Sequence, residues 1–189
     1  MKNLGTLTFE EIGRPVIGID PGVKGAIAWI DSKGMNVIKM PPERDACRAL
    51  NSLIDSLKEY RPVVFIEEVF IVRAQANMKN YVTRYGTLLG AVYAHITDVE
   101  LYEVPPTQWQ EHYTSLTTTD LHSSRRLPRA EAAAIKKQRR AEIKQSSRST
   151  AACLYPQFSK DLQKTTADGL SDAILLCLYG AHFISGRIS

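Results

Sequence analysis

Two short apolar runs that each end in an acidic residue constrain the fold of this chain more than any other feature. Val16–Asp20 is followed by Pro21-Gly22, and Val63–Glu67 follows Arg61-Pro62. Runs of β-branched residues bounded by turn residues predict buried strands. A carboxylate at the end of such a strand is costly to bury without a counter-charge. The two runs therefore predict a sheet with charged groups at its edge.

The other elements follow from periodicity and from turn residues. Further strands are predicted at Ala26–Ile30, Met35–Met40 and Glu100–Val104, with a hairpin turn at Asp31–Gly34. Helices are predicted at Glu43–Tyr60, Gln75–Ile96 and Arg129–Leu154, with a short one capped by Thr107 and a last one from Asp168. This order predicts an α/β fold, a central five-stranded mixed sheet flanked by helices.

Length and composition favour one globular domain. The chain has 189 residues, 44% hydrophobic and 23% charged. We expect a single domain over 1–189, with 1–15 a short extension and about 112–148 a basic loop and helix insertion. No apolar run approaches the roughly 20 residues of a membrane span, and Met1–Arg14 lacks the apolar segment of a secretion signal. Three widely spaced cysteines form neither a disulfide framework nor a metal knuckle, so we expect a reducing cytoplasm.

Basic residues gather in one segment. The net charge is +4, but between Arg125 and Arg148 nine Lys and Arg residues stand against two acids. A basic block on a near-neutral body is the electrostatic footprint of a polyanion partner. A solvated charged helix explains the same block equally well, so a second signal is needed.

The acids supply that signal. If the two acid-ended strands are neighbours, Asp20 and Glu67 project toward one spot, while Asp168 and Asp172 share one helix face at i and i+4. Four converging carboxylates repel one another unless a cation lies between them, and oxygen donors select Mg²⁺ or Mn²⁺. Each acid also has a structural explanation: Asp20 as a turn former, Glu67 as a surface strand end, and the last two as helix N-terminal acids.

Three motifs carry a resemblance. Gly18–Gly22 followed by Gly25-Ala-Ile-Ala, then Ile66–Phe70, then Asp168–Ile174, resemble the RuvC family of Holliday junction resolvases in order and spacing over about Val16–Leu178. The resemblance implies an RNase H-like fold, a homodimer, and a divalent-metal endonuclease that cuts a four-way DNA junction with symmetric nicks. It implies two Mg²⁺ ions per site, replaceable by Mn²⁺, and ends with 5′-phosphate and 3′-hydroxyl. The implied catalytic and metal-binding residues are Asp20, Glu67, Asp168 and Asp172.

The sequence departs from the bacterial members in two places. Its last two acids are four positions apart instead of three, a form similar to phage, poxviral and organellar relatives, so we expect a phage origin and the cytoplasm of a bacterium or an infected host. Glu68 stands where bacterial members usually have Gln. We choose Glu67 as the ligand because it directly follows the apolar run.

Residues for DNA contact follow from the basic helix and the resemblance. Lys144 lies near a lysine that the family keeps before its last helix, and Phe70 corresponds to an aromatic that the family places against junction base pairs; Phe70 as a core residue explains it as well. The predicted DNA-binding residues are Phe70, Arg129, Lys136, Lys137, Arg139, Arg140, Lys144 and Arg148. We expect Tyr81 and Trp109 to be packing residues. The small residues Gly86, Gly90 and Ala94 admit either another element of this chain or a second subunit.

Other functions remain open. An RNase H-like nuclease acting on a flap or an RNA–DNA hybrid fits the same residues. A non-catalytic junction-binding protein fits them if the acids are remnants. An actin-like or sugar-kinase ATPase shares the Asp20-Pro-Gly22 and Gly25 pattern, but that fold needs two such domains and this chain has room for one.

Overall fold

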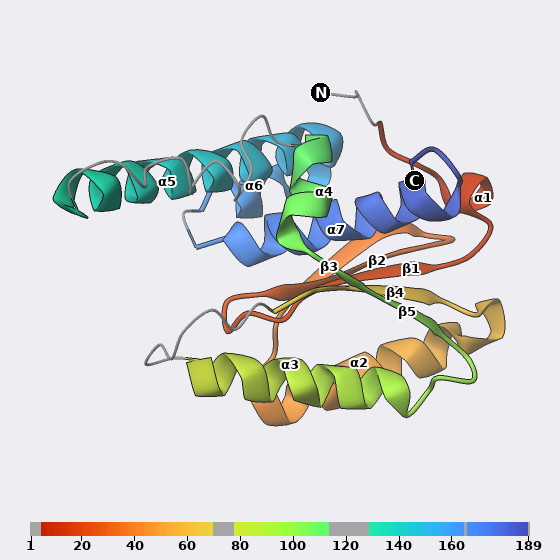
Figure 1. Cartoon of the computed structure of the whole chain (residues 1–189). Helices are drawn as coiled ribbons and strands as arrows, with labels where there is room; N and C mark the ends of the chain where they lie inside the picture. The colour runs from red at the N-terminus through yellow and green to blue at the C-terminus, as the bar shows by residue number, and fades with distance from the viewer. Residues whose placement is uncertain (1–4, 70–77, 114–128, 165, 189) are drawn as a thin grey trace.

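A central five-stranded sheet with helices on both faces organises the chain (Figure 1). The computed structural model describes residues 5–69, 78–113, 129–164 and 166–188; for 78, 129, 130, 132 and 136 it describes the backbone alone. The strands are β1 (Val16–Asp20), β2 (Ala26–Asp31), β3 (Gly34–Lys39), β4 (Val63–Glu67) and β5 (Glu100–Val104). The predicted α/β class with a mixed sheet is therefore confirmed.

The strand order is β3-β2-β1-β4-β5. The first three strands form an antiparallel meander, and β4 and β5 run parallel to β1. In the parallel pair Ile19 lies opposite Ile66, so Asp20 and Glu67 follow at neighbouring positions. Adjacent strands lie about 4.8 Å apart. The two acid-ended strands are thus neighbours, with both acids at the same edge of the sheet.

One face of the sheet is covered by α2 (Glu43–Leu57) and α3 (Met78–Tyr93). Helix α2 ends three residues earlier than predicted, because Lys58–Tyr60 tighten into the 3₁₀ turn η1 and Arg61 takes a left-handed conformation before Pro62. Helix α3 ends at Tyr93 and not at Ile96 as predicted, because the residues after Tyr93 form successive turns that lead into β5. The predicted start at Gln75 lies outside the described residues.

The other face is covered by α7 (Asp168–Ile184), which lies across the sheet beneath α4 (Pro106–Tyr113) and α5 (Arg129–Leu154) (Figure 1). The prediction that Thr107 caps α4 is wrong, since the helix already begins at Pro106, whose fixed φ suits the first helical position. A short α6 (Ser159–Leu162) follows the 3₁₀ turn η3 (Pro156–Phe158).

Helix α7 is the central element of its layer. All its residues from Gly169 to His182 are buried except Asp172. A helix that is apolar on all sides belongs in a core. At the opposite end of the sheet from Asp20, residues 5–14 pack against the end of α7: the short α1 (Phe9–Ile12) buries Ile12, and Arg187 forms an ion pair with Glu11.

Two glycines of the sequence motifs are explained by the crossing of α7 over β1. A Cβ atom at Gly18 would lie 2.4 Å from the backbone nitrogen of Cys177, and one at Gly169 would lie 2.1 Å from the carbonyl oxygen of Lys24. Both distances are shorter than van der Waals contact, so only glycine fits. The backbones therefore approach closely enough to bring the first turn of α7 against the loop after β1.

Candidate acidic site

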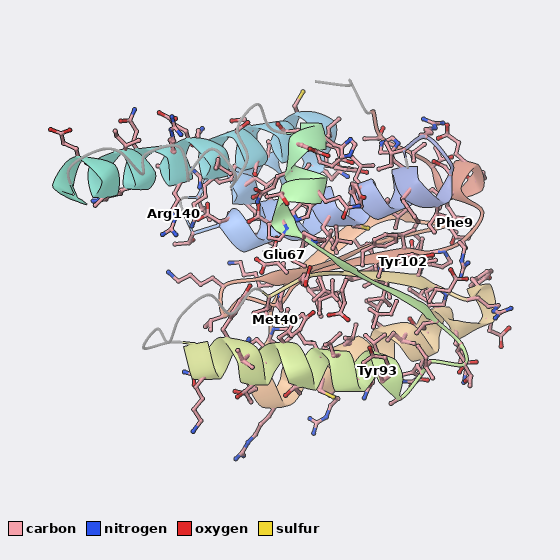
Figure 2. The ribbon with its side chains drawn as sticks, in the orientation of Figure 1. Phe9, Met40, Glu67, Tyr93, Tyr102 and Arg140 are labelled. Atoms are coloured by element: carbon pink, nitrogen blue, oxygen red, sulfur yellow. The ribbon has the colours of Figure 1, made fainter. Side chains whose placement is uncertain are left out.

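The edge of the sheet where β1 and β4 end gathers the acidic side chains that the sequence singled out. Asp20 ends β1, Glu67 ends β4, and Asp168 and Asp172 lie in the first two turns of α7. Asp20, Asp168 and Asp172 line one hollow of about 230 Å³ together with Lys24, Lys144 and Thr166. Glu67, which is labelled in Figure 2, lies close enough to this hollow for the charges of Asp20 and Asp172 to act on it.

The mutual repulsion of these acids shows in their pKa values. Burial, opposed mainly by the backbone N–H of Gly22, raises the pKa of Asp20 to about 6. Burial and then the charges of Asp20 and Asp172 raise the pKa of Glu67 well above its usual range. Burial and then Asp20 and Asp168 do the same to the pKa of Asp172. The edge is therefore a place where a positive charge is favoured.

Asp168 is the acid whose charge is already compensated. Lys144 Nζ donates to its Oδ2 at 2.7 Å, and Arg148 forms an ion pair with its Oδ1. Both cations come from α5, one turn apart, and Lys144 is about half exposed. The sequence predicted them as contacts to DNA; in the structure both hold an acid of this site.

Two further groups orient the acids. Trp109, fully buried in α4, donates its indole N–H to Glu67 Oε2 at 3.1 Å. The backbone N–H of Gly22 donates to Asp20 Oδ1 at 2.8 Å, which fixes the turn after β1. Trp109 is a packing residue, as expected, but it also positions Glu67. No local signal reveals this, because the contact joins residues 42 positions apart.

Glu67 and Glu68 lie in different surroundings, because successive side chains at the end of a strand point to opposite faces of the sheet. Glu67 lies beside Asp20 and Asp172, whereas the charge of Glu68 acts on Tyr85 of α3 together with Glu103. Tyr81, also expected to be a packing residue, lies close enough to the acids for Glu67, Asp20 and Asp172 to raise its pKa, after burial.

The donor set fits a hard divalent cation, because it consists of carboxylate oxygens with raised pKa values. Within the described part of the chain, however, no three His, Cys, Asp or Glu side chains are close enough to hold one ion. Binding of metal would therefore require side chains of the site to move. Asp168 is one of the side chains that would have to move, because Lys144 and Arg148 hold its carboxylate toward α5.

The predicted DNA-contact residues have different outcomes. Phe70 lies outside the described residues, as do the side chains of Arg129 and Lys136 within α5. Arg140 of α5 (labelled in Figure 2) and Lys137 are exposed, and Arg139 is half-buried. Most of the predicted insertion before Arg129 also lies outside the described residues.

The arrangement defines a class of fold: a mixed sheet of this order, crossed by a C-terminal helix that brings acids to the end of the first strand, is the RNase H-like fold. Among solved structures, RuvC of Thermus thermophilus matches with 18% identity over 92% of this chain and 95% of that chain, at a TM-score of 0.50. The resemblance to the RuvC resolvases is thus confirmed at the level of the fold.

Two further solved structures match at lower scores. T. thermophilus RuvC in complex with a Holliday junction substrate shares 19% identity, over 92% of this chain and 95% of that chain, at a TM-score of 0.47. The fowlpox virus Holliday junction resolvase shares 13% identity over 91% of this chain and 99% of that chain, at a TM-score of 0.39. No protein-family model and no curated protein sequence matches the chain.

Three free cysteines, Cys47, Cys153 and Cys177, are present in the described residues. No described helix has the length and apolar character that crossing a membrane requires.

Proposed function

We propose that this protein is a metal-dependent endonuclease that resolves four-way DNA junctions. The observation that carries the proposal is the meeting of Asp20, Glu67 and Asp172, from three separate elements, beside a basic helix. Carboxylates of raised pKa at one edge are the arrangement expected of a divalent-metal site. The exposed cations of α5 supply the phosphate contacts that give a nuclease its affinity.

In this proposal, Asp20, Glu67, Asp168 and Asp172 hold two Mg²⁺ ions, for which Mn²⁺ substitutes. Bound metal supplies an activated water and neutralises charge on the scissile phosphate. The chain's own residues set the geometry: Trp109 holds the carboxylate of Glu67, and the turn at Gly22 holds that of Asp20. If Asp168 held metal it would have to give up its ion pairs with Lys144 and Arg148, and both cations would then be available to phosphate.

A homodimer is part of the proposal, because a four-way junction presents two equivalent strands. The exposed face of α3 supports it. A Cβ atom at Gly86 or Gly90 would have no atom of a described residue within 4 Å, so the interpretation that these glycines admit another element of this chain is wrong for the described residues. Beside them Tyr93 (labelled in Figure 2) is 53% exposed and Ile96 is 52% exposed. A second copy of α3 would cover this face.

The test is cleavage of a synthetic four-way junction labelled on each strand in turn. We expect paired nicks at symmetric positions in Mg²⁺, with 5′-phosphate and 3′-hydroxyl ends, and none in EDTA. Asp20→Asn is expected to abolish cutting and to retain binding. Flap and RNA–DNA hybrid substrates belong in the same experiment, since preferential cutting of either would replace the junction as substrate. The activity belongs to DNA recombination or repair in the cytoplasm of a bacterium or phage-infected host.

A second candidate, a junction-binding protein without catalysis, is favoured by one observation: Lys144 and Arg148 already neutralise Asp168. Junction binding by the unmutated protein without cutting in either Mg²⁺ or Mn²⁺ would establish that candidate and overturn the first.

A further inference from the structure

The acidic hollow opens beside a second one. This neighbour, of about 270 Å³, shares Lys24, Gly25 and Thr166 with it and extends to Lys39 at the end of β3. The loop after β1 thus forms a ridge, with the acids on one side and the second hollow on the other. Neither Lys24 nor Lys39 was singled out by the sequence, since both lie outside the basic segment.

The two hollows differ in charge. The acidic hollow contains three carboxylates and two lysines, Lys24 and Lys144; Lys144 forms an ion pair with Asp168, as does Arg148 of α5. Among the described residues that line the second hollow there is no acid; beside its two lysines are Thr166 and the apolar Val23, Met40 and Leu170.

The side chains of both lysines are exposed and, among the described residues, neither side chain forms a hydrogen bond or an ion pair. Lys39 acts electrostatically on Asp161 from a distance, but Lys164 already holds that carboxylate at 2.7 Å. Next to the acids, on the side toward β3, these two lysine side chains therefore carry positive charge that has no close partner among the described residues.

The ligand class follows from this placement. One strand of duplex DNA carries a phosphate roughly every 3.4 Å along the helix axis, so a strand whose scissile phosphate lies at the acids has its next phosphates within reach of the adjoining hollow. Val23 is 60% exposed on the ridge between the hollows and offers an apolar contact to a sugar. Two lysines, a hydroxyl and an apolar wall suit a sugar–phosphate backbone better than a base edge.

We infer that Lys24 and Lys39 form a second phosphate-binding subsite, which holds the cleaved strand beside its scissile phosphate while α5 contacts the DNA from the other side. This inference rests on the proposed function, because it requires the strand to pass the acids. It adds a subsite formed by the β1–β2 loop and the end of β3, outside the basic helix.

The experiment is junction binding in EDTA, measured by fluorescence anisotropy over a range of salt. The variant Lys24→Ala/Lys39→Ala is expected to bind about tenfold more weakly and to lower the slope of log K against log [salt] by about 2, one for each lost phosphate contact. The control is Lys33→Ala/Lys58→Ala, which removes the same charge from exposed positions at the opposite end of the sheet. Its slope is expected to stay within about 0.5 of the wild-type value.

A second readout locates the contact. In the wild-type protein, an uncharged methylphosphonate placed next to the cut is expected to weaken binding, and in the double variant it is expected to have no further effect. Such loss of additivity shows that lysines and phosphate interact. Equal salt slopes for the double variant and its control, with normal cutting by the wild type, overturn the subsite and leave the proposed function standing. A wild-type protein that neither binds nor cuts junctions overturns both.

Discussion

The acidic side chains differ from one another in how their charge is compensated. Asp168 has two cations within ion-pair distance, whereas Asp20, Glu67 and Asp172 are half-buried and lie close to other acids. Burial of like charges lowers the free energy of unfolding, and the hydrogen bonds and cations of the described residues offset this only in part. The site is therefore a strained part of the fold in the absence of a cation, and this strain has a measurable dependence on pH.

Asp20 gives the clearest case, because its pKa in the folded chain is about 6, against about 3.9 when unfolded. Between these values the folded state keeps a proton that the unfolded state has lost. In EDTA, the contribution of Asp20 to the free energy of unfolding is therefore full below about pH 4 and is lost as the pH rises through about 6, a decrease of about 3 kcal/mol.

Urea unfolding of the wild type and of Asp20→Asn from pH 4 to 7.5 checks this. The free energy of unfolding of Asp20→Asn, relative to that of the wild type, is expected to increase from about pH 4 to about pH 6 and to stay higher above pH 6. Asp161→Asn serves as control, because Lys164 lowers the pKa of that carboxyl and its neutralisation gives no such gain. A constant difference between the wild type and Asp20→Asn at all pH values would contradict the expectation.

At the scale of elements, the site depends on how closely α7 crosses β1. The contact passes through Gly18, where an added methyl group meets the backbone of Cys177. Backbone atoms on both sides cannot rotate away as a side chain does, so helix and strand would have to separate. The positions of Asp168 and Asp172 relative to Asp20 are set by the same crossing.

Gly18→Ala is accordingly expected to lower the free energy of unfolding by about 3 kcal/mol and to weaken metal-dependent cutting. Gly86 of α3 has open space around it, so Gly86→Ala is expected to raise the free energy of unfolding by about 0.5–1 kcal/mol through helix propensity. This value applies at concentrations where the chain is monomeric. Urea unfolding of the two variants measures both effects. A Gly18→Ala protein as stable as the wild type would show that the crossing tolerates a side chain.

At the scale of the whole molecule, the sheet separates two working faces. Helices α5 and α7 lie on the face that carries the acidic site and the basic side chains of α5, and on the other face no described residue covers Gly86 or Gly90 of α3 (Figure 1). A dimer through α3 therefore leaves both acidic sites accessible.

Gly90→Arg places a long charged side chain on that face, where a Cβ atom has no described atom within 4 Å, so we expect the chain to fold. We expect light scattering to give twice the 21.1 kDa chain mass for the wild type and the single mass for this variant. Paired nicks in a junction then become single nicks. Ser32→Arg, in the exposed turn between β2 and β3, is the control that should stay dimeric. If Gly90→Arg stays dimeric, the dimer interface does not lie on this face of α3.

Much of this fold was readable from the order of residues, for a local reason. An apolar run such as Val63–Glu67 specifies a buried strand through its own side chains, and the helical spacing of acids at Asp168 and Asp172 specifies a shared face. Element boundaries were less readable where turns compete with helix, as after α2 and α3. The acids at element ends, the mixed sheet and the basic helix all follow from patterns a few residues long.

Side-chain partners were decided by the tertiary structure alone. Trp109 meets Glu67 because β5, which pairs with β4, leads directly into α4, and Arg148 meets Asp168 because α5 packs against α7. Lys24 and Lys39 share a hollow because the β2–β3 hairpin returns the chain to the same edge. A sequence encodes burial and periodicity locally, whereas charge compensation depends on which distant elements cross, and only the packed fold fixes that.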